Sequence, residues 1–481
     1  MVRFSEAFKL NKSQEELDFV DIPLHTDIKL FVDPYAISIR KEQWFQECNE
    51  LIVSYFQTIL DNIRKGFEVK ARYLLSNLSE PNETHLGHSM GISSGCGVGN
   101  IQGGDIYKSL SKSKAVLSGD LSDLSDCALM IEGIGPDKIS DITINIIRKK
   151  LAEYTKNQCE LYGIETVRKR LKPYWNFETC NWENDYYDLP IFERQPILLC
   201  PKLAVRQHLL LNDSDFYQYD ILEFLQAEHI NSGTALVETL KKGGERVTKK
   251  KLMEQEEYRK TKDFIYDFTS EHPEILTKYK NRKKKDGLSH ISNNEIENMQ
   301  ETKIKPDINK LKQDLISIHP GTANATKFHD ICISILNIIF YPYLSLFKKE
   351  QDINDGRKRI DIIATNFDKS GFFFDLAIKH RINVPLIMFE CKNYTCDINN
   401  PELDQIAGRL CDSRGRIGFV LCRTIDQKDY ILKKQKDYLK DNKYIIVLDD
   451  QDLLQLLTFK DHNNETELNS FLYEKLNELI L

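Results

Sequence analysis

The feature that most constrains the fold is a regular alternation of helical and strand patterns in the last third of the chain, which begins near residue 311. Segments with helical periodicity take turns there with short apolar runs. The expected helices span 323–340, 371–382, 401–413 and 427–441, and the expected strands span 359–365, 385–391, 417–423 and 444–450. This alternation predicts an α/β domain with a mixed sheet and helices on both faces.

The strand expected at 385–391 ends with two ionisable residues in an otherwise apolar run. In "LIMFECKNY" (386–394), Glu390 and Lys392 point to the same side of an extended chain, because side chains alternate. Burying both of them costs free energy unless they pair or bind a metal. The tripeptide alone also fits a strand end that emerges into solvent.

A second acidic residue, Asp361, lies in the preceding expected strand, within "GRKRIDIIA". If the two strands are neighbours, Asp361 converges with Glu390 and Lys392 at one end of the sheet. Two carboxylates repel unless a cation lies between them, and oxygen ligands suit Mg²⁺ or Mn²⁺. Such an ion and an adjacent lysine supply what phosphodiester cleavage needs: an activated water and stabilisation of the charge that develops on the phosphate.

With "RID", "FECKNY" and a following helix that carries Gln405, this part resembles the PD-(D/E)XK nucleases, especially their Mrr-type restriction-endonuclease branch. The resemblance implies a restriction-endonuclease-like mixed sheet flanked by helices. It also implies that Asp361, Glu390 and the backbone carbonyl of Cys391 ligate the metal, and that Lys392 is the catalytic lysine. Gln405 matches a glutamine that many members place on that helix and is expected to be catalytic.

The first helix of this part departs from the pattern of the family. Many Mrr-type members carry a glutamate there that joins the metal site, whereas "KFHDICISIL" has His329 at that position and Asp330 beside it. Histidine can ligate a metal, but Mg²⁺ prefers oxygen, so a structural histidine stays an equal alternative.

Several basic residues near this site are expected to contact DNA. Arg357, Lys358 and Arg359 form a turn just before the aspartate, and Arg409 lies one helical turn beyond the glutamine. A solvated face is the alternative for the basic turn. Asn393 and Tyr394, which follow the lysine directly, are candidates for supporting the site.

A basic segment precedes the expected nuclease domain. Residues 241–290 hold 15 lysines and arginines against 9 acidic residues, whereas the whole chain has a net charge of −7. The run Lys283, Lys284 and Lys285 either clamps a DNA backbone or belongs to a solvated arm between domains.

These shifts in pattern divide the chain into three expected parts. Residues 1–235 form a mixed α/β domain that senses or selects the target, 236–310 form a basic helical arm or linker, and 311–481 form the nuclease domain. Within the first part, helices are expected at 50–67 and 139–164 and a strand at 195–205. Seven of the 22 glycines lie within residues 87–104, where a surface loop or a loop that approaches a phosphate closely would fit.

Composition narrows the cellular setting. Apolar residues make up 41% and charged residues 29% of the chain, and no apolar run has the length of a signal peptide or a membrane span. The eleven cysteines are scattered without the spacing of a zinc site. These observations predict a cytoplasmic protein with reduced thiols and no membrane partner.

The principal expectation is a metal-dependent DNA endonuclease that uses Mg²⁺ or Mn²⁺. An unrelated domain in front of a nuclease is typical of restriction and anti-phage defence effectors, which predicts DNA and a partner protein of a defence system as binding partners. Double-strand cleavage usually needs two protomers, so a homodimer or higher oligomer is expected. The alternatives are a nucleic-acid- or nucleotide-binding subunit with a non-catalytic nuclease fold, and a structural subunit of a defence complex.

Overall fold

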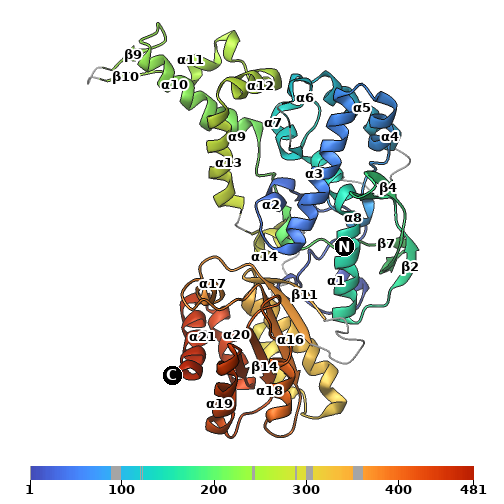
Figure 1. The fold of residues 1–481 in the computed structure, drawn as a ribbon, viewed down its shortest axis with the longest axis vertical. Helices are drawn as coiled ribbons and strands as arrows, with labels where there is room; N and C mark the ends of the chain where they lie inside the picture. The colour runs from blue at the N-terminus through green and yellow to red at the C-terminus, as the bar shows by residue number, and fades with distance from the viewer. Residues whose placement is uncertain are drawn as a thin grey trace.

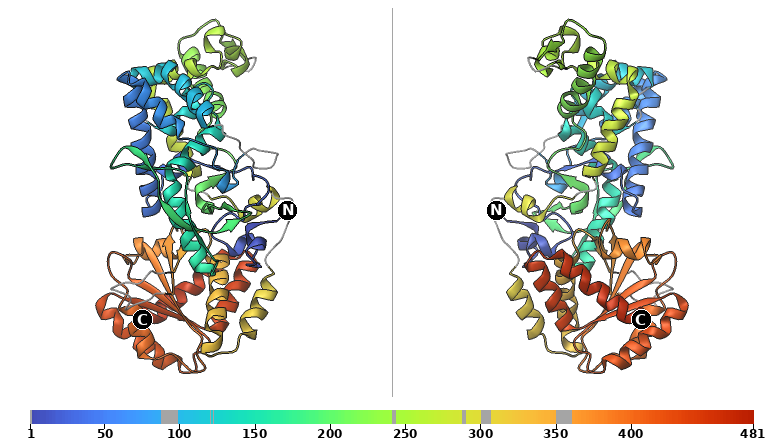
Figure 2. Two further views of the ribbon diagram at one scale, coloured as in Figure 1. Left: turned by 90° about the vertical axis from the view of Figure 1, so that its right-hand side faces the viewer. Right: turned by 90° about the vertical axis from the view of Figure 1, so that its left-hand side faces the viewer.

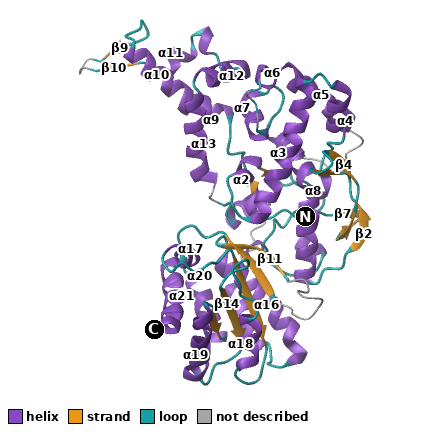
Figure 3. Cartoon of the chain, in the orientation of Figure 1, coloured by secondary structure: helices purple, strands orange, loops and turns teal. Residues whose placement is uncertain are grey.

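The computed structural model describes residues 2–87, 99–119, 121, 123–240, 244–287, 290–299, 307–349 and 361–481. They form two parts stacked along the long axis of the molecule (Figure 1), as the two side views in Figure 2 also show. We call the residues up to 299 the N-terminal part and the residues from 307 the C-terminal part. Helices dominate the N-terminal part, whereas the largest sheet lies in the C-terminal part (Figure 3).

The sheet of the C-terminal part has five strands in the order β11-β12-β13-β14-β15. They are β11 (Leu344–Lys348), β12 (Ile362–Asn366), β13 (Leu386–Lys392), β14 (Ile417–Cys422) and β15 (Tyr444–Leu448). The pairs β11–β12 and β12–β13 are antiparallel, and the pairs β13–β14 and β14–β15 are parallel. The predicted mixed sheet is therefore confirmed.

Helices cover both faces of this sheet, because alternate side chains of each strand point to opposite sides. On one side, Phe389 and Phe419 pack in a core with α15 (Ile308–Ser317), α16 (Ala325–Phe340), α17 (Phe372–Ile378), α20 (Asp450–Asp461) and α21 (Glu465–Ile480). On the other side, Met388 and Val420 pack in a smaller core with α18 (Asn400–Ala407) and α19 (Lys428–Asp437).

Most of the predicted elements of the C-terminal part are present within a few residues of their expected bounds. The structure adds β11, which was not predicted, and the two helices that end the chain. The strand predicted at 195–205 is wrong, since only its ends are extended pairs, β7 (Gln195–Pro196) and β8 (Val205–Arg206). Between them the backbone bonds to scattered partners, such as Glu83 and the Thr155 hydroxyl, and Pro201 has no amide hydrogen to donate to a ladder.

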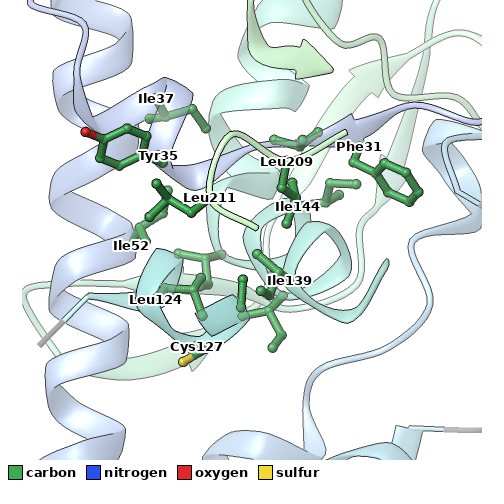
Figure 4. Close-up of a cluster of buried hydrophobic side chains, with 14 of the residues drawn as sticks. Phe31, Tyr35, Ile37, Ile52, Leu124, Cys127, Ile139, Ile144, Leu209 and Leu211 are labelled. Carbon is green, nitrogen blue, oxygen red and sulfur yellow. The ribbon is translucent and has the colours of Figure 1, made fainter. Parts of the chain in front are cut away.

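The N-terminal part is built around two long helices, α3 (Gln43–Arg64) and α8 (Pro136–Tyr162), which confirms the two helices predicted there. Their apolar faces pack together with neighbouring loops, and Figure 4 shows a group of these buried side chains, among them Ile52 of α3 and Ile139 of α8. An antiparallel strand pair, β2 (Val167–Arg170) with β5 (Tyr186–Leu189), lies beside α8.

The basic segment is helical, with α11 (Lys249–Met253), α12 (Lys262–Glu271), α13 (Pro273–Gly287) and α14 (Asn293–Met299). Ile265, Phe268 and Tyr279 of this segment are buried in the same core as the N-terminal helices. The domain boundaries at 235 and 310 stay predictions.

A buried polar contact joins the two parts. Asp18, which is fully buried, accepts hydrogen bonds from the amide of Leu346 at 3.0 and 3.1 Å and from the Tyr154 hydroxyl at 2.8 Å. The Ser345 hydroxyl donates to the same carboxylate. Burial raises the pKa of Asp18, and these hydrogen bonds oppose the rise. Asp18 thus anchors the edge strand β11 to the N-terminal part.

In the described ranges of the chain, none of the helices combines the length and the apolar character that a membrane span requires.

Candidate active site

The structure brings Asp361, Glu390 and Lys392 together on one face of the C-terminal sheet. Asp361 directly precedes β12, and its carboxylate accepts a hydrogen bond of 2.7 Å from the amide of Cys391 on β13. Glu390 and Lys392 lie at the end of β13, where they share a face because they are two residues apart. The antiparallel register of β12 and β13 therefore produces the cluster.

Glu390 is the centre of the hydrogen-bond network at this site. It is 0% exposed, and one carboxylate oxygen accepts from the Lys392 ammonium at 2.8 Å and from the Gln405 amide at 2.5 Å. Arg409 donates to the other oxygen. The Lys392 ammonium also donates to the side-chain oxygen of Gln405 at 3.1 Å. Both oxygens of this buried carboxylate therefore have partners.

The electrostatics of the site follow from this arrangement. Burial raises the pKa of Glu390, and so does the charge of Asp361, while Lys392 and Arg409 oppose the rise. Burial lowers the pKa of Lys392, but the charge and the hydrogen bond of Glu390 outweigh burial and leave this pKa above its ordinary value. Lys392 is therefore an ammonium at neutral pH.

Arg409 does not occupy the position expected of a DNA contact. Helix α18 ends at Ala407, so Arg409 lies in the turn beyond it, with a side chain that is 2% exposed and ion-paired with Glu390. A guanidinium buried in this way cannot reach a phosphate backbone. The structure instead places Arg409 in the interior, where it pairs with Glu390.

His329 lies at the site but contacts the backbone of Asp361 and not its carboxylate. Its Nε2 atom is 3.3 Å from the carbonyl oxygen of Asp361, and this oxygen can only accept, so Nε2 carries the proton. Asp330 is half exposed, and its carboxylate is 3.9 Å from the other ring nitrogen of His329. These contacts favour the structural role for His329.

Asn393 has a structural role that the sequence did not reveal. Its side-chain amide donates to the carbonyl oxygens of His319 and Gly321 at 3.2 and 2.8 Å, and its oxygen accepts from Arg423 at 2.9 Å. It therefore ties the end of β13 to the loop between α15 and α16. Tyr394 is partly exposed and lies next to this network.

Among the described residues, the other predicted DNA contacts, Lys283, Lys284 and Lys285, do not lie at this site. Arg357, Lys358 and Arg359 lie outside the described residues, as does most of the glycine-rich segment. Lys283 belongs to α13 in the N-terminal part and pairs with Asp215 at 2.9 Å. Lys284 and Lys285 are exposed on the same helix.

The donor set at the site fits a hard divalent cation. Within the described ranges no three side chains of histidine, cysteine, aspartate or glutamate are grouped so that they could hold a metal ion. Mg²⁺ is often bound by one or two carboxylates and keeps several waters. Asp361 and Glu390 supply two such carboxylates, close enough for one charge to raise the pKa of the other.

Among the comparisons with known proteins, a family model matches within the N-terminal part. Residues 9–212 match the family model described as a domain of unknown function, DUF8370. The chain is 29% identical over 130 residues to the "Putative transposon gamma-delta 80.3 kDa protein" of Escherichia coli (strain K12), which covers 27% of this chain and 18% of that protein. The chain thus spans less than a fifth of the length of this relative. No solved structure matches the present chain.

Proposed function

We propose that the C-terminal part is a metal-dependent nuclease of the PD-(D/E)XK type that hydrolyses phosphodiester bonds in DNA. The observation that carries the proposal is the convergence of Asp361, Glu390 and Lys392 on one face of a mixed sheet, with Gln405 bonded to two of them. A strand end that merely emerges into solvent would not bury a glutamate completely or surround it with two cations.

The residues of the site have distinct tasks in this proposal. Asp361 and Glu390 would hold Mg²⁺ or Mn²⁺, which when bound supplies charge neutralisation and a more acidic water. Lys392 presents an ammonium to the phosphate oxygens that gain charge in the transition state. Gln405 and Glu390 fix the position of this ammonium. Arg409 orients Glu390 from the buried side, and the Cys391 amide orients Asp361.

Two further considerations support DNA as the substrate. The PD-(D/E)XK nucleases that the sequence resembles include restriction endonucleases. The name of the matched Escherichia coli protein refers to a transposon, which is a DNA element. We extend the proposal to a restriction or defence role, in which the N-terminal part selects the target and two copies of the chain cleave both strands.

One observation favours a second candidate, a nucleic-acid-binding subunit whose nuclease-like domain does not cleave. Both oxygens of Glu390 are engaged by side chains of the protein, two of which are cations. A carboxylate in this state must exchange a partner before it can ligate a metal. A nuclease-like domain that does not cleave would keep this hydrogen-bond network around Glu390 unchanged.

Nicking of supercoiled plasmid in Mg²⁺, Mn²⁺ or EDTA tests the proposal. The wild-type protein should nick with either metal and not with EDTA. Asp361→Asn, which keeps the acceptor for the Cys391 amide but removes the charge, should reduce nicking by orders of magnitude without loss of fold. Lys392→Ala should do the same, whereas Glu390→Ala should abolish nicking and also reduce stability, because it leaves the buried Arg409 without its ion-pair partner. Binding of DNA without nicking in any metal would support the second candidate instead.

A further inference from the structure

A basic cleft lies where the two parts of the molecule meet. It has a volume of about 620 Å³ and is lined by α8, the β2–β5 pair and the edge of the C-terminal sheet. Its lining contains five basic and two acidic residues, although the chain as a whole has a net charge of −7. The basic residues come from both parts: Lys156 and Arg168 from one, Lys348, Lys349 and Arg414 from the other. A concave surface with this excess charge concentrates anions.

The cleft lies on the face of the sheet that carries the candidate active site. Leu386 lines it and precedes Glu390 by four residues on β13, which is about 13 Å at the rise of an extended strand. Ile363 also lines it and follows Asp361 by two residues. Lys348 is the partner of Ile363 across β11 and β12, so its side chain shares their face. A ligand in the cleft would thus lie on the same face of the sheet as the two carboxylates.

The wall that the N-terminal part contributes combines charge with aromatic rings. All four residues of β2, "VRKR", are exposed, and Arg168 of this strand lines the cleft. Tyr186 and Tyr187 of the partner strand β5 line it as well, and Tyr186 is 54% exposed. Cations that follow a backbone and rings that stack on bases are the two features of a surface that binds single-stranded nucleic acid.

The size of the cleft suits a single strand of nucleic acid better than a duplex. A volume of 620 Å³ lies in the range of small-ligand sites, about 300–1,000 Å³. A site of this size can enclose a few nucleotides, whereas a duplex could only rest on its rim. A short stretch of one strand fits.

We infer that this cleft binds a single strand of DNA and leads it to Asp361 and Glu390, with Arg168 and Lys349 on the phosphates and Tyr186 stacked on a base. This inference deepens the proposed nuclease function. The binding of a single strand does not depend on that function, but the expected consequence does: cleavage next to an unpaired or displaced strand.

The test measures binding apart from cleavage. A labelled single-stranded oligonucleotide and a blunt duplex of the same sequence are titrated with the full-length protein in EDTA, and binding is followed by fluorescence anisotropy at several salt concentrations. Arg168→Ala, Tyr186→Ala and Lys349→Ala test the two walls. Lys169→Ala is the matched control, because Lys169 is the exposed neighbour of Arg168 on β2, carries the same charge and does not line the cleft.

The wild type should bind the single strand more tightly than the duplex. Tyr186→Ala should weaken this binding about tenfold, in line with the loss of one stacked base. Arg168→Ala and Lys349→Ala should each reduce the slope of log affinity against log salt by about 0.7, one phosphate contact on a single strand. Lys169→Ala should leave both quantities unchanged. Circular dichroism should show the same secondary structure in the variants as in the wild type.

Three results would overturn the inference: equal affinity of the wild type for single strand and duplex, unchanged binding in all three cleft variants, or the same loss in Lys169→Ala as in Arg168→Ala. Plasmid nicking in Mg²⁺ keeps the two proposals apart. If the protein nicks DNA but its cleft variants bind DNA normally, the cleft inference is refuted and the nuclease proposal stands. If binding depends on the cleft but the protein never nicks DNA, the cleft inference stands and the nuclease proposal is refuted.

Discussion

Arg409 and Glu390 form an ion pair that is withdrawn from water, since their side chains are 2% and 1% exposed. Arg409 lies in the turn after α18, and Glu390 lies on β13, so the pair connects the helix layer to the sheet at the candidate active site. Charges in such a place must be paired, because an isolated charge in a protein interior is very costly. The pair therefore affects both the stability of the domain and the orientation of the carboxylate.

Removal of the arginine should destabilise the protein strongly. Arg409→Met leaves the carboxylate of Glu390 buried with one partner fewer, which costs about 3–5 kcal/mol. The double variant Arg409→Met, Glu390→Gln should lose clearly less than the sum of the two single variants, because both charges of the pair are then removed together. Urea denaturation measures all four proteins. Arg416→Met is the control: its pair with Asp412 is largely exposed on the aspartate side and should contribute little to stability. Additive losses would contradict the coupling.

Gln405 should matter for the rate of cleavage more than for stability. It contacts both Glu390 and Lys392, and residues that orient the groups at a metal site typically change activity by about 10–100-fold. We expect Gln405→Ala to reduce the rate of plasmid nicking by this factor in Mg²⁺. The midpoint of its urea denaturation should stay close to that of the wild type. Asn400→Ala, an exposed change on the same helix, should nick like the wild type. Equal rates in the two variants would remove Gln405 from the site.

The sequence allowed the core of this site to be predicted because its signal is local. Glu390 and Lys392 stand out in an apolar strand, and the short spacing to Asp361 suits a neighbouring antiparallel strand. The environment of Arg409 could not be predicted in the same way. The helical pattern continues past Gly408, so Arg409 was expected on the surface of a helix, whereas α18 ends before it and the chain turns inward.

Other features depend on contacts between distant segments. Strand β11 follows α16 within one long apolar run, and its antiparallel pairing with β12 is what separates it from the helix. The strand β2 has four exposed residues and lacks the alternation that identifies a half-buried strand. Its position beside Lys348 and Lys349 results from the packing of the two parts against each other. No pattern within either segment contains that information.

His329 should be tolerant of substitution if it supports the backbone of Asp361. We expect His329→Gln, which keeps a side-chain donor, to nick within a few-fold of the wild type, and His329→Ala to lose about 1 kcal/mol of stability with the hydrogen bond. His329→Glu would place a carboxylate beside a carbonyl oxygen and should reduce stability further. Stability comes from urea denaturation, and rates come from nicking at several pH values.

A metal-binding histidine would give the opposite pattern. His329→Ala would then lose orders of magnitude in rate, and His329→Glu would retain activity with Mg²⁺, since a carboxylate suits that ion. A metal ligand must be deprotonated, so the pH profiles of the wild type and the glutamate variant would then differ on the acid side. Observation of this pattern at equal stability would return His329 to the metal site.

The junction between the two parts contains a buried lysine that should make stability depend on pH. Lys202 is fully buried, and its ammonium lies 3.8 Å from the centre of the Tyr341 ring of the C-terminal part and 3.0 Å from the side-chain oxygen of Asn293. Burial lowers its pKa to about 7, and the charges of Asp18, Glu15 and Glu297 only partly oppose this. In the unfolded chain the pKa of a lysine is about 10.4.

The sign of the effect follows from the protons bound in each state. Above pH 7 the unfolded chain keeps the proton on Lys202 and the folded chain releases it, so the free energy of unfolding rises with pH. The contribution approaches about 1.4 kcal/mol per pH unit and ends near the unfolded pKa. Below pH 7 both states are protonated, and the cost of burying the charge is present in full.

Lys202→Met should therefore be most stabilising, relative to the wild type, at pH 6–7, and should lose this advantage toward pH 9. Urea denaturation at pH 6, 7, 8 and 9 measures the difference, with Lys29→Met as the exposed control that should run parallel to the wild type. A difference between wild type and Lys202→Met that does not change with pH would show that Lys202 keeps its proton in the folded protein, so that its buried charge is compensated by Asp18 and by the ring of Tyr341.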